Sequence, residues 1–395
     1  MKLLAVAGEP SGDAHGGPLL SGLKRLIPAL DVEGIGGPLM QNAGLRSLYP
    51  FSELQVHGIV EILHHLPRLY AMLWGLEKRL DAARPDALLL IDYPGFNLKL
   101  ASSAKKRGIP VIFYSSPQVW AWRKRRLSTI ARAVDLMIVL FPFEAAIYRD
   151  IGVDVAFAGH PLVGVEASAE ETARLRKRVT LDPSRPVVAV IPGSRPSEIE
   201  RNLPAILAGI ELIRDTGFEA NFLMPLAPNL DQHRVESLVE ASGAPVQVVR
   251  DAFLPLLKLA DIAIAASGTA TLQLGLAGVP FVVVYRMSRL TYLLAKKFAY
   301  VRHISIVNIL AGKEIVPELL QSDFAAESVR DTFLQIANDP DRRNAINGDL
   351  QAIAKSLGEP GAYGRTAELI ATRLENWSRR TAAATADRVP ARTFA

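Results

Sequence analysis

The chain has 395 residues, of which 49% are hydrophobic and 22% are charged, and its formal net charge is +5. This is the composition of a globular protein, and the length exceeds what one hydrophobic core usually supports, so we expect two domains. The sequence contains no cysteine, which excludes disulfides, thiolate metal sites and cysteine nucleophiles, and no apolar run reaches the roughly 18 residues that span a bilayer.

Short apolar runs alternate with longer amphipathic segments, as in βα units around a parallel sheet. The first run ends early, at Gly8 and Glu9, which favours a first buried strand over an export signal and predicts a cytoplasmic protein. In the first half we expect strands at Leu3–Ala7, Val32–Ile35, Ala87–Ile91, Val111–Tyr114, Leu136–Leu140 and Val155–Ala158. In the second half we expect strands at Val187–Ile191, Ala220–Met224, Val246–Val249, Ile262–Ala265 and Phe281–Val284.

The segment Val163–Pro186 has no strand pattern and carries a charged, helix-prone stretch, so we place the domain boundary there. The predicted fold class is α/β, with two Rossmann-like domains facing each other across a cleft. The expected parts are an N-terminal domain, a C-terminal domain, helices that close the fold and a disordered tail, at residues 1–165, 166–345, 346–378 and 379–395.

The turn after the first strand is rich in glycine and polar side chains. Ligands of open α/β sheets bind beyond the carboxyl ends of the strands, so this turn is a candidate site. Capping the next helix would need only one hydroxyl or carboxylate, so the additional polar residues favour a functional site over a helix cap. A G-x-G-x-x-G fingerprint is absent, which counts against a dehydrogenase. The candidate residues are Glu9, Ser11, Asp13 and His15.

Asp92 follows four aliphatic residues at the end of a predicted strand, and a Pro-Gly turn comes after it. A carboxylate beside an apolar wall can have a raised pKa, which suits a general base. The alternative is an ordinary cap or turn residue. One strand further on, Trp120, Trp122 and Arg123 offer aromatic faces for a sugar or acyl chain and a guanidinium for a phosphate, with core packing of one tryptophan as the alternative.

Two turns of the second half have the pattern of anion sites, in which a strand ends in small residues and a helix begins. Free N–H groups and the helix dipole would face a phosphate there, and two such turns indicate a diphosphate ligand such as a nucleotide-sugar. Plain βα turns are the alternative. The candidate residues are Gly193, Ser194, Arg195, Ser267, Gly268 and Thr269.

Asn308, Glu318 and Gln321 lie in a region expected to be a polar loop and short helix; they could hold a base or ribose, or be surface residues. No grouping has metal-ligand spacing, so we predict no metal. Two basic, aromatic stretches, Ile62–Leu80 and Tyr285–His303, have the pattern of helices that lie in a membrane interface, although such helices are more often packed on a core.

Eight motifs occur along the chain in a fixed order and cover residue 7 to about residue 321. They are A-G-E-P-S-G-D-A-H-G, I-D-Y-P-G-F-N, S-P-Q-V-W-A-W-R, F-P-F-E, G-H-P-L, P-G-S-R-P-S-E-I, S-G-T-A-T-L and the N-I-L to P-E-L-L-Q region. Together these motifs closely resemble those of the lipid-A-disaccharide synthase family, whose members have the GT-B fold and are peripheral membrane proteins.

The resemblance implies an inverting hexosyl transfer from UDP-2,3-diacylglucosamine to the 6-hydroxyl of 2,3-diacylglucosamine 1-phosphate. It implies Asp92 as the base, an acceptor and lipid side formed by the first-half candidates, no cofactor, and attachment to the inner-membrane surface. The second-half candidates would hold the nucleotide. Nucleic acid is not an expected partner, and a homo-oligomer is left open.

One residue departs from the family pattern. Gln273 stands where the family usually has Glu, so one acceptor oxygen and an NH₂ donor replace a carboxylate at the expected ribose contact. Two alternatives to the transferase remain: an isomerase such as a UDP-N-acetylglucosamine 2-epimerase, and a non-catalytic nucleotide-sugar-binding protein.

Overall fold

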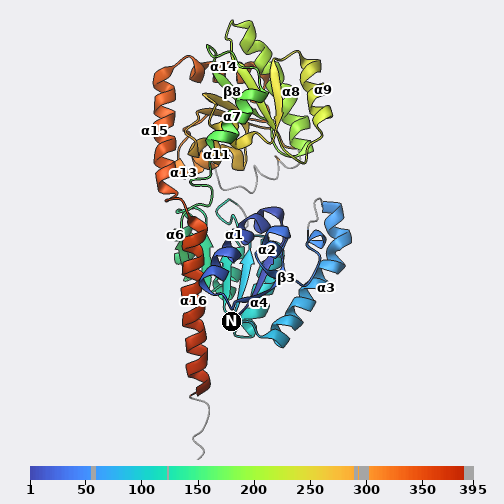
Figure 1. The fold of residues 1–395 in the computed structure, drawn as a ribbon, viewed down its shortest axis with the longest axis vertical. Coiled ribbons are helices and arrows are strands. Elements are labelled where there is room, and N and C mark those ends of the chain that lie inside the picture. The colour runs from blue at the N-terminus through green and yellow to red at the C-terminus, as the bar shows by residue number, and fades with distance from the viewer. Residues whose placement is uncertain (55–58, 122–123, 289–291, 293–301, 387–395) are drawn as a thin grey trace, which may run out of the picture. The chain divides into compact units, whose positions relative to one another are not determined.

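The computed structural model describes residues 1–54, 59–121, 124–288, 292 and 302–386, and the chain forms two compact units (Figure 1). The first unit consists of Met1–Pro161 together with Gly358–Ala395, and the second of Leu162–Leu357. The division falls a few residues before the expected boundary at 165/166. The C-terminal helices do not form one group, because the chain returns to the first unit at Gly358.

The first unit contains a parallel sheet of seven strands in the order β3-β2-β1-β4-β5-β6-β7. Ile91 pairs with Ala7 on one side and with Tyr114 on the other, so the turns after β1, β4 and β5 leave the same edge of the sheet. The short edge strand β3 was not predicted, because it has three residues and only its first is buried. The strands are β1 (Lys2–Ala7), β2 (Asp31–Ile35), β3 (Leu45–Ser47), β4 (Ala87–Ile91), β5 (Val111–Tyr114), β6 (Leu136–Val139) and β7 (Asp154–Phe157).

Helices cover both faces of this sheet, because alternate residues of a strand point to opposite faces. In β1, Leu4 and Val6 belong to a buried cluster with α3 and α4, whereas Leu3 and Ala5 belong to a second cluster with α1 and α16. The helices are α1 (Pro10–Leu26), α2 (Pro38–Asn42), the 3₁₀ turn η1 (Phe51–Glu53), α3 (Ile59–Ala83), α4 (Pro94–Lys106), α5 (Arg126–Ala133), α6 (Glu144–Arg149) and α16 (Ala362–Ala386).

Helix α16 is the long C-terminal helix drawn in red in Figure 1. It packs along α1, where Gly22 lets the helices approach: a Cβ on Gly22 would lie 3.0 Å from the Cβ of Ala367. The helix continues to Ala386, which corrects the expectation that a disordered tail begins at residue 379. Residues 387–395 lie outside the described part of the chain.

The second unit contains a parallel sheet of six strands in the order β10-β9-β8-β11-β12-β13. The edge strand β13 was missed because it is short and only half-buried. The strands are β8 (Val187–Ile191), β9 (Asn221–Leu226), β10 (Val246–Arg250), β11 (Ile262–Ala266), β12 (Phe281–Tyr285) and β13 (Glu318–Leu320). The helices are α7 (Ala169–Arg178), α8 (Pro196–Asp215), α9 (Gln232–Ser242), α10 (Phe253–Leu257), α11 (Thr269–Leu276), α13 (Ile306–Ala311), α14 (Ala326–Ala337) and α15 (Pro340–Ser356).

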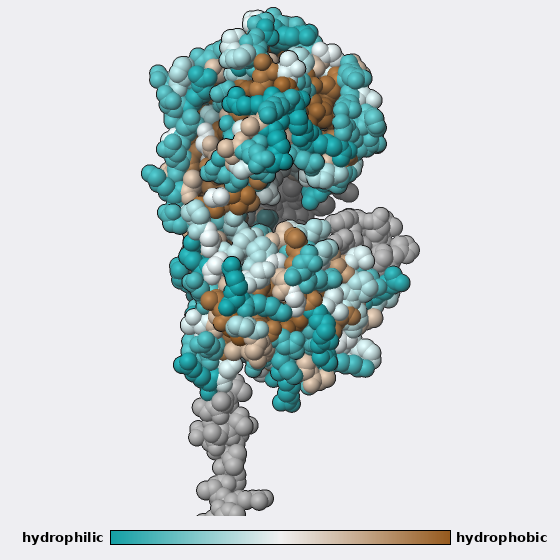
Figure 2. Space-filling view, in the orientation of Figure 1, coloured by the Kyte–Doolittle hydropathy of each residue, from teal (hydrophilic) through white to brown (hydrophobic). Residues whose placement is uncertain are grey.

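The surface visible in Figure 2 is largely hydrophilic on both units, with smaller hydrophobic patches between the hydrophilic residues. Among the residues that the structure describes, no helix combines the length and the apolar character needed to cross a membrane.

Candidate active site

The turn between β4 and α4 has a strained backbone. Asp92 and Tyr93 have φ values of +50° and +47°, in the left-handed region that residues other than glycine rarely adopt, and Ser115 after the adjacent β5 has a φ of +64°. Each such conformation costs on the order of 1–3 kcal/mol, so it persists only where the surrounding structure enforces it. Strain of this kind gathers at functional sites, and here it lies where Asp92 was predicted to act.

The neighbouring turn after β1 makes room for this conformation. The ring of Tyr93 lies against Gly8, and a Cβ on Gly8 would be 2.3 Å from Cδ1 of that ring. The backbone N–H of Asp92 donates to the carbonyl of Tyr114, at 3.0 Å. A glycine at position 8 is therefore required by the close approach of an aromatic ring, a reason that the sequence alone did not reveal.

The environment of Asp92 favours a proton acceptor that works near neutral pH. Burial raises the pKa of Asp92, the negative charge of Glu9 raises it further, and a hydrogen bond from the Tyr93 backbone opposes both, leaving the pKa at about 6. Glu9 is the N-cap residue of α1, and its side chain makes no capping hydrogen bond. The carboxyl of Asp92 is thus ionised at pH 7 and more basic than an ordinary aspartate.

His15 lies in the second turn of α1 and contacts a residue from the far end of the chain. Its Nδ1 is 2.8 Å from the hydroxyl of Tyr363 on α16, and its ring meets that of Tyr114 edge-on, with centroids 5.6 Å apart. Burial lowers the pKa of His15, so the imidazole is neutral at pH 7. Sequence reasoning missed Tyr363, which lies 348 residues further along the chain. Ser11 is exposed in the first turn of α1.

Asp13 has a structural role in the fold, and its predicted place on the acceptor side stays a prediction. It is 4% exposed, and its two oxygens accept the backbone N–H groups of Leu39 and Met40, both at 3.0 Å. Those N–H groups belong to the first turn of α2, whose N-cap residue, Gly37, has no side chain to satisfy them. Both oxygens of Asp13 are therefore engaged in capping another helix.

Trp120 is anchored by a buried carboxylate, which supports the structural alternative for this residue. Its Nε1 donates to Glu144 at 3.0 Å, and Ser116 donates to the same oxygen at 2.6 Å. Burial raises the pKa of Glu144, and these hydrogen bonds oppose the rise. The F-P-F-E motif thus ends in the residue that holds the loop after β5. The other two residues predicted for this loop, Trp122 and Arg123, lie outside the described residues.

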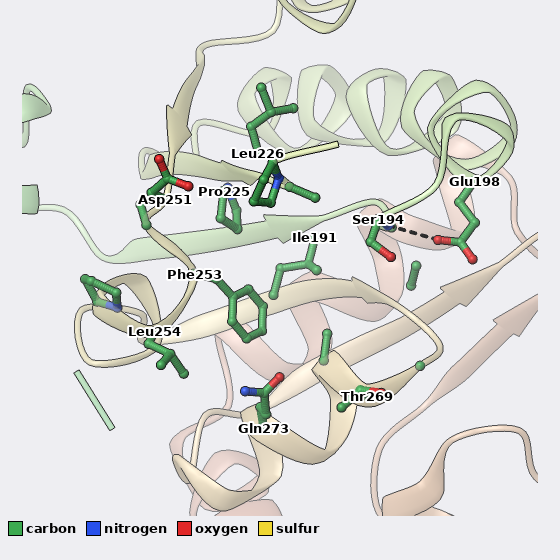
Figure 3. Close-up of a pocket in the computed structure, with 18 of the residues that line it drawn as sticks. Ile191, Ser194, Glu198, Pro225, Leu226, Asp251, Phe253, Leu254, Thr269 and Gln273 are labelled. Atoms are coloured by element: carbon green, nitrogen blue, oxygen red, sulfur yellow. Dashed lines mark hydrogen bonds between the residues drawn. The ribbon is translucent and has the colours of Figure 1, made fainter. Parts of the chain in front are cut away.

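The second unit has a cavity of about 920 Å³ beyond the carboxyl ends of its strands (Figure 3). It brings together the two turns predicted to bind an anion, and it is also lined by the loop after β10, by Tyr285, and by Arg174 and Arg178 of α7. The predicted residues on its wall are Gly193, Ser194, Arg195, Ser267, Gly268, Thr269 and Gln273.

The turn before α8 is already occupied by a side chain of its own helix. Glu198 accepts the backbone N–H groups of Ser194 and Arg195, at 2.9 and 3.2 Å, and the Arg195 guanidinium at 3.1 Å. Figure 3 shows Glu198 reaching back to Ser194. This capping arrangement uses N–H groups that were expected to be available to a phosphate. The Arg195 side chain is nevertheless 76% exposed and carries its charge at the cavity wall.

The turn before α11 is open. Its N-cap residue is Gly268, no side chain caps the helix, and a Cβ on Gly268 would meet no atom within 4 Å. The hydroxyl of Ser267 donates to the carbonyl of Ile304, at 3.0 Å, which fixes the turn from outside. Thr269 and Gln273 lie on the same helix at the cavity (Figure 3). The positive end of the α11 dipole thus faces a space where an anion can approach the backbone closely.

Asn308 and Glu318 form a hydrogen-bonded pair inside the second unit and are not among the residues that line this cavity, so their predicted role in holding the nucleotide stays a prediction. Asn308 is fully buried, donates to Glu318 at 2.8 Å, and accepts from Ile315 and Val316. Glu318, on strand β13 rather than a helix, accepts the N–H groups of residues 304 and 305. Gln321 likewise lies off the cavity wall; its amide is 3.4 Å from the carbonyl of Met287.

Helix α3 exposes aromatic side chains on one face. Trp74 and Tyr70 are 60% and 53% exposed, whereas Leu76 on the other face is fully buried. The ammonium groups of Lys78 and Lys99 lie over the two rings, 3.4 and 4.4 Å from the centroids of Trp74 and Tyr70. Most of the second predicted amphipathic stretch, Tyr285–His303, lies outside the described residues. Within the described ranges, no three His, Asp or Glu side chains are grouped closely enough to hold a metal ion.

Known proteins resemble this chain both in sequence and in fold. A family model described as lipid-A-disaccharide synthetase matches residues 3–370. The lipid-A-disaccharide synthase of Syntrophus aciditrophicus is 41% identical over 94% of this chain and 97% of its own length, and that of Geobacter metallireducens is 40% identical over 93% and 96%.

Solved structures with lower sequence identity share the fold. A UDP-N-acetylglucosamine 2-epimerase from Neisseria meningitidis bound to UDP-GlcNAc has a TM-score of 0.59 and 13% identity, with 95% of this chain and all of the other chain covered. Spinosyn forosaminyltransferase SpnP has a TM-score of 0.60 and 13% identity, with 95% and 99% covered. These likenesses confirm the predicted α/β class with two Rossmann-like domains of the GT-B type.

Proposed function

This chain belongs to the lipid-A-disaccharide synthase family, and we propose that Asp92 is the base of its glycosyl transfer. The chain is a glycosyltransferase, and its substrates are UDP-2,3-diacylglucosamine and 2,3-diacylglucosamine 1-phosphate, as the family's name implies. The epimerase alternative has only a shared fold at 11–13% identity in its support, whereas the relatives at 38–41% identity are synthases.

The transfer proceeds with inversion at the anomeric carbon. The acceptor 6-hydroxyl gives its proton to Asp92 as its oxygen bonds to the anomeric carbon, and the bond from that carbon to the UDP oxygen breaks with its electron pair going to UDP. Asp92 then releases the proton to solvent. The observation that carries this assignment is the strained turn that holds Asp92 in a partly buried place beside Glu9, where its pKa is about 6.

The diphosphate of the donor binds at the open turn before α11. Gly268 allows close approach there, and the dipole of α11 stabilises the charge that grows on the departing UDP. Arg174, Arg178 and Arg195 add positive charge to the same cavity. Gln273 faces the cavity from α11 and offers the ribose one acceptor oxygen and one NH₂ group.

These cationic and dipolar groups give the reaction a source of charge stabilisation without a cofactor. We therefore expect transfer to continue in the presence of a chelator such as EDTA. Loss of activity with EDTA, restored by Mg²⁺, would contradict this part of the proposal.

The lipid substrates are presented at the cytoplasmic surface of the inner membrane, and the exposed aromatic face of α3 contributes to binding that surface. Trp74 and Tyr70, flanked by Lys78 and Lys99, combine side chains that suit the interface with charges that attract anionic lipids. The test is sedimentation with vesicles of phosphatidylethanolamine and phosphatidylglycerol. Trp74→Ala should weaken binding several-fold, whereas an exposed residue on another helix, as in Glu170→Ala on α7, should leave it unchanged.

The activity itself is tested in mixed micelles that contain both lipid substrates, with UDP and disaccharide followed together. Equal amounts of the two products are expected. UDP release without disaccharide would mean hydrolysis or a different acceptor. UDP binding without any reaction would favour a non-catalytic nucleotide-sugar-binding protein.

A further inference from the structure

Asn97 is a buried polar residue beside the strained turn, and the mechanism above does not use it. It lies in the first turns of α4, five residues after Asp92, and it is fully buried. Its amide Nδ2 lies 2.7 Å from the carbonyl oxygen of Asp92 and 3.3 and 3.5 Å from those of Ile91 and Val6. Its Oδ1 accepts no hydrogen bond from the described residues, so donation alone sets the orientation of the amide.

The shortest of these hydrogen bonds, from Asn97 to the Asp92 carbonyl, satisfies a backbone group in the strained turn. Asp92 is half-buried and lies one residue beyond the end of β4, where its carbonyl oxygen needs a hydrogen-bond donor in place of a neighbouring strand. Asn97 supplies that donor at the residue where the backbone is strained. Without the amide, the left-handed conformation would leave a carbonyl unsatisfied, whereas an extended conformation would relieve the strain.

We propose that Asn97 is a positioning residue for the proton transfer: its amide holds the Asp92 carbonyl, and thereby keeps the Asp92 carboxyl in its partly buried place beside Glu9. The inference rests on the proposed role of Asp92 as the base. Two further contacts act on the same turn: the Tyr93 ring lies against Gly8 of the β1 turn, and Tyr114 of β5 accepts the Asp92 N–H. Glu9, at the start of α1, is the charged group that acts on Asp92, and the phenol of Tyr93 also lies within reach of its field.

The decisive variant is Asn97→Leu, which has a similar size and no donor. With the carbonyl released, the turn relaxes and the Asp92 carboxyl moves away from Glu9 toward solvent. The kcat should fall by about 10²-fold, while the Kd for UDP stays the same, because the nucleotide cavity is in the other unit. The acid limb of the kcat profile, expected near pH 6 in the natural protein, should move to lower pH, since the pKa of Asp92 falls toward its ordinary value.

Asn221→Leu is the matched control. Asn221 is also buried, and its amide donates to two backbone carbonyls, those of Asp182 and Arg185, at 2.9 and 3.0 Å, but it lies in the second unit. It should lower the melting temperature in the same way and leave the acid limb in place. An acid limb of Asn97→Leu at the natural pH would overturn the proposal and leave Asn97 a purely structural residue.

Two other variants keep the test decisive if Asn97→Leu does not fold. Asn97→Ser retains a hydroxyl donor and should keep the acid limb closer to its natural position. Gly8→Ala pushes on the Tyr93 ring without removing a hydrogen bond and should shift the limb as Asn97→Leu does. If Gly8→Ala lowers kcat with the limb unmoved, the proposal fails. Full transfer by Asp92→Asn would instead refute the base assignment, which is a separate result.

Discussion

The turns that follow β4 and β11 have the same strand–turn–helix arrangement, but one holds a carboxyl group and the other is open to an anion. Each leaves the carboxyl end of a buried parallel strand and opens a helix without a side-chain cap. After β4, two residues other than glycine are forced into the left-handed region, and a carboxyl is kept close to another negative charge. After β11, a glycine leaves the helix N-terminus open toward a cavity with arginines on its wall.

The difference shows that a general base requires a strained backbone here, whereas an anion site does not. A base with a raised pKa needs a carboxyl held away from water in one orientation, so the surrounding side chains must enforce an unfavourable backbone. An anion site needs only accessible N–H groups and close approach, which glycine provides without any enforcing contact. The turn before α8 is neither a strained turn that holds a base nor an open anion site, because Glu198 already accepts its backbone N–H groups.

The largest effect expected is that of Asp92→Asn. The amide cannot accept the acceptor's proton, so kcat should fall by about 10³-fold, while the Kd for UDP, measured by calorimetry, stays within twofold of the natural value. This outcome would show that the turn after β4 serves proton transfer and not anion binding. A variant that retained more than a tenth of the natural rate would show that another group is the base.

The same substitution should change stability in a pH-dependent way. The pKa of Asp92 is raised from 3.8 to about 6, so the folded protein penalises the ionised carboxyl. The stability that Asp92 contributes is complete below pH 3.8 and is lost as the pH rises through about 6. Asp92→Asn should therefore be more stable than the natural protein at pH 8, by about 3 kcal/mol, with almost no difference near pH 3.5.

Urea denaturation at the two pH values measures this difference. A stability advantage that is equal at both pH values would mean that the carboxyl is not held in an unfavourable environment. The contrast between the two turns would then rest on backbone geometry alone.

Gly268→Val tests the other turn. The new side chain fills the space at the start of α11 where the diphosphate is expected, so the Kd for UDP should rise at least about tenfold, with the acid limb of kcat unchanged. Gly348→Val is the control, because Gly348 is in the same unit, away from the cavity, and a Cβ there also meets open space. Equal affinity in both variants would place the phosphates elsewhere.

The smallest effect is expected for Glu198→Gln. The turn before α8 is satisfied internally, and the amide oxygen of glutamine can still accept from one of its N–H groups, so the Kd for UDP should change less than about threefold. A change of more than tenfold would mean that this turn takes part in holding the diphosphate, and the distinction between the two turns of the second unit would no longer hold.

The sequence predicted the two-domain α/β fold well, because buried parallel strands read as continuous apolar runs between amphipathic helices. It also placed Asp92 and Gly268 correctly in turns after strands, since both follow such runs closely, while their functional roles stay predictions. It missed β3 and β13, which are short and lie at sheet edges. The resemblance to a family added the reaction, which periodicity alone does not contain.

Local pattern could not decide which polar residues face a ligand and which serve the fold. Asp13 and Glu9 lie four residues apart on one turn, yet Asp13 caps α2 while Glu9 acts on the charge of Asp92. Asn308 and Glu318 satisfy each other inside the second unit.

Most of the strands, and the places where turns leave the sheets, could be predicted from the sequence, because they follow from hydrophobic period and turn chemistry. The sequence did not show that Glu198 accepts the N–H groups of one predicted anion turn, that Tyr363 contacts His15 from the end of the chain, or that Asn97 donates to the backbone of Asp92. Each of these contacts joins groups that are brought together by folding. Buried polar groups, those of the backbone above all, need hydrogen-bond partners, and the local sequence does not show which partner will be near.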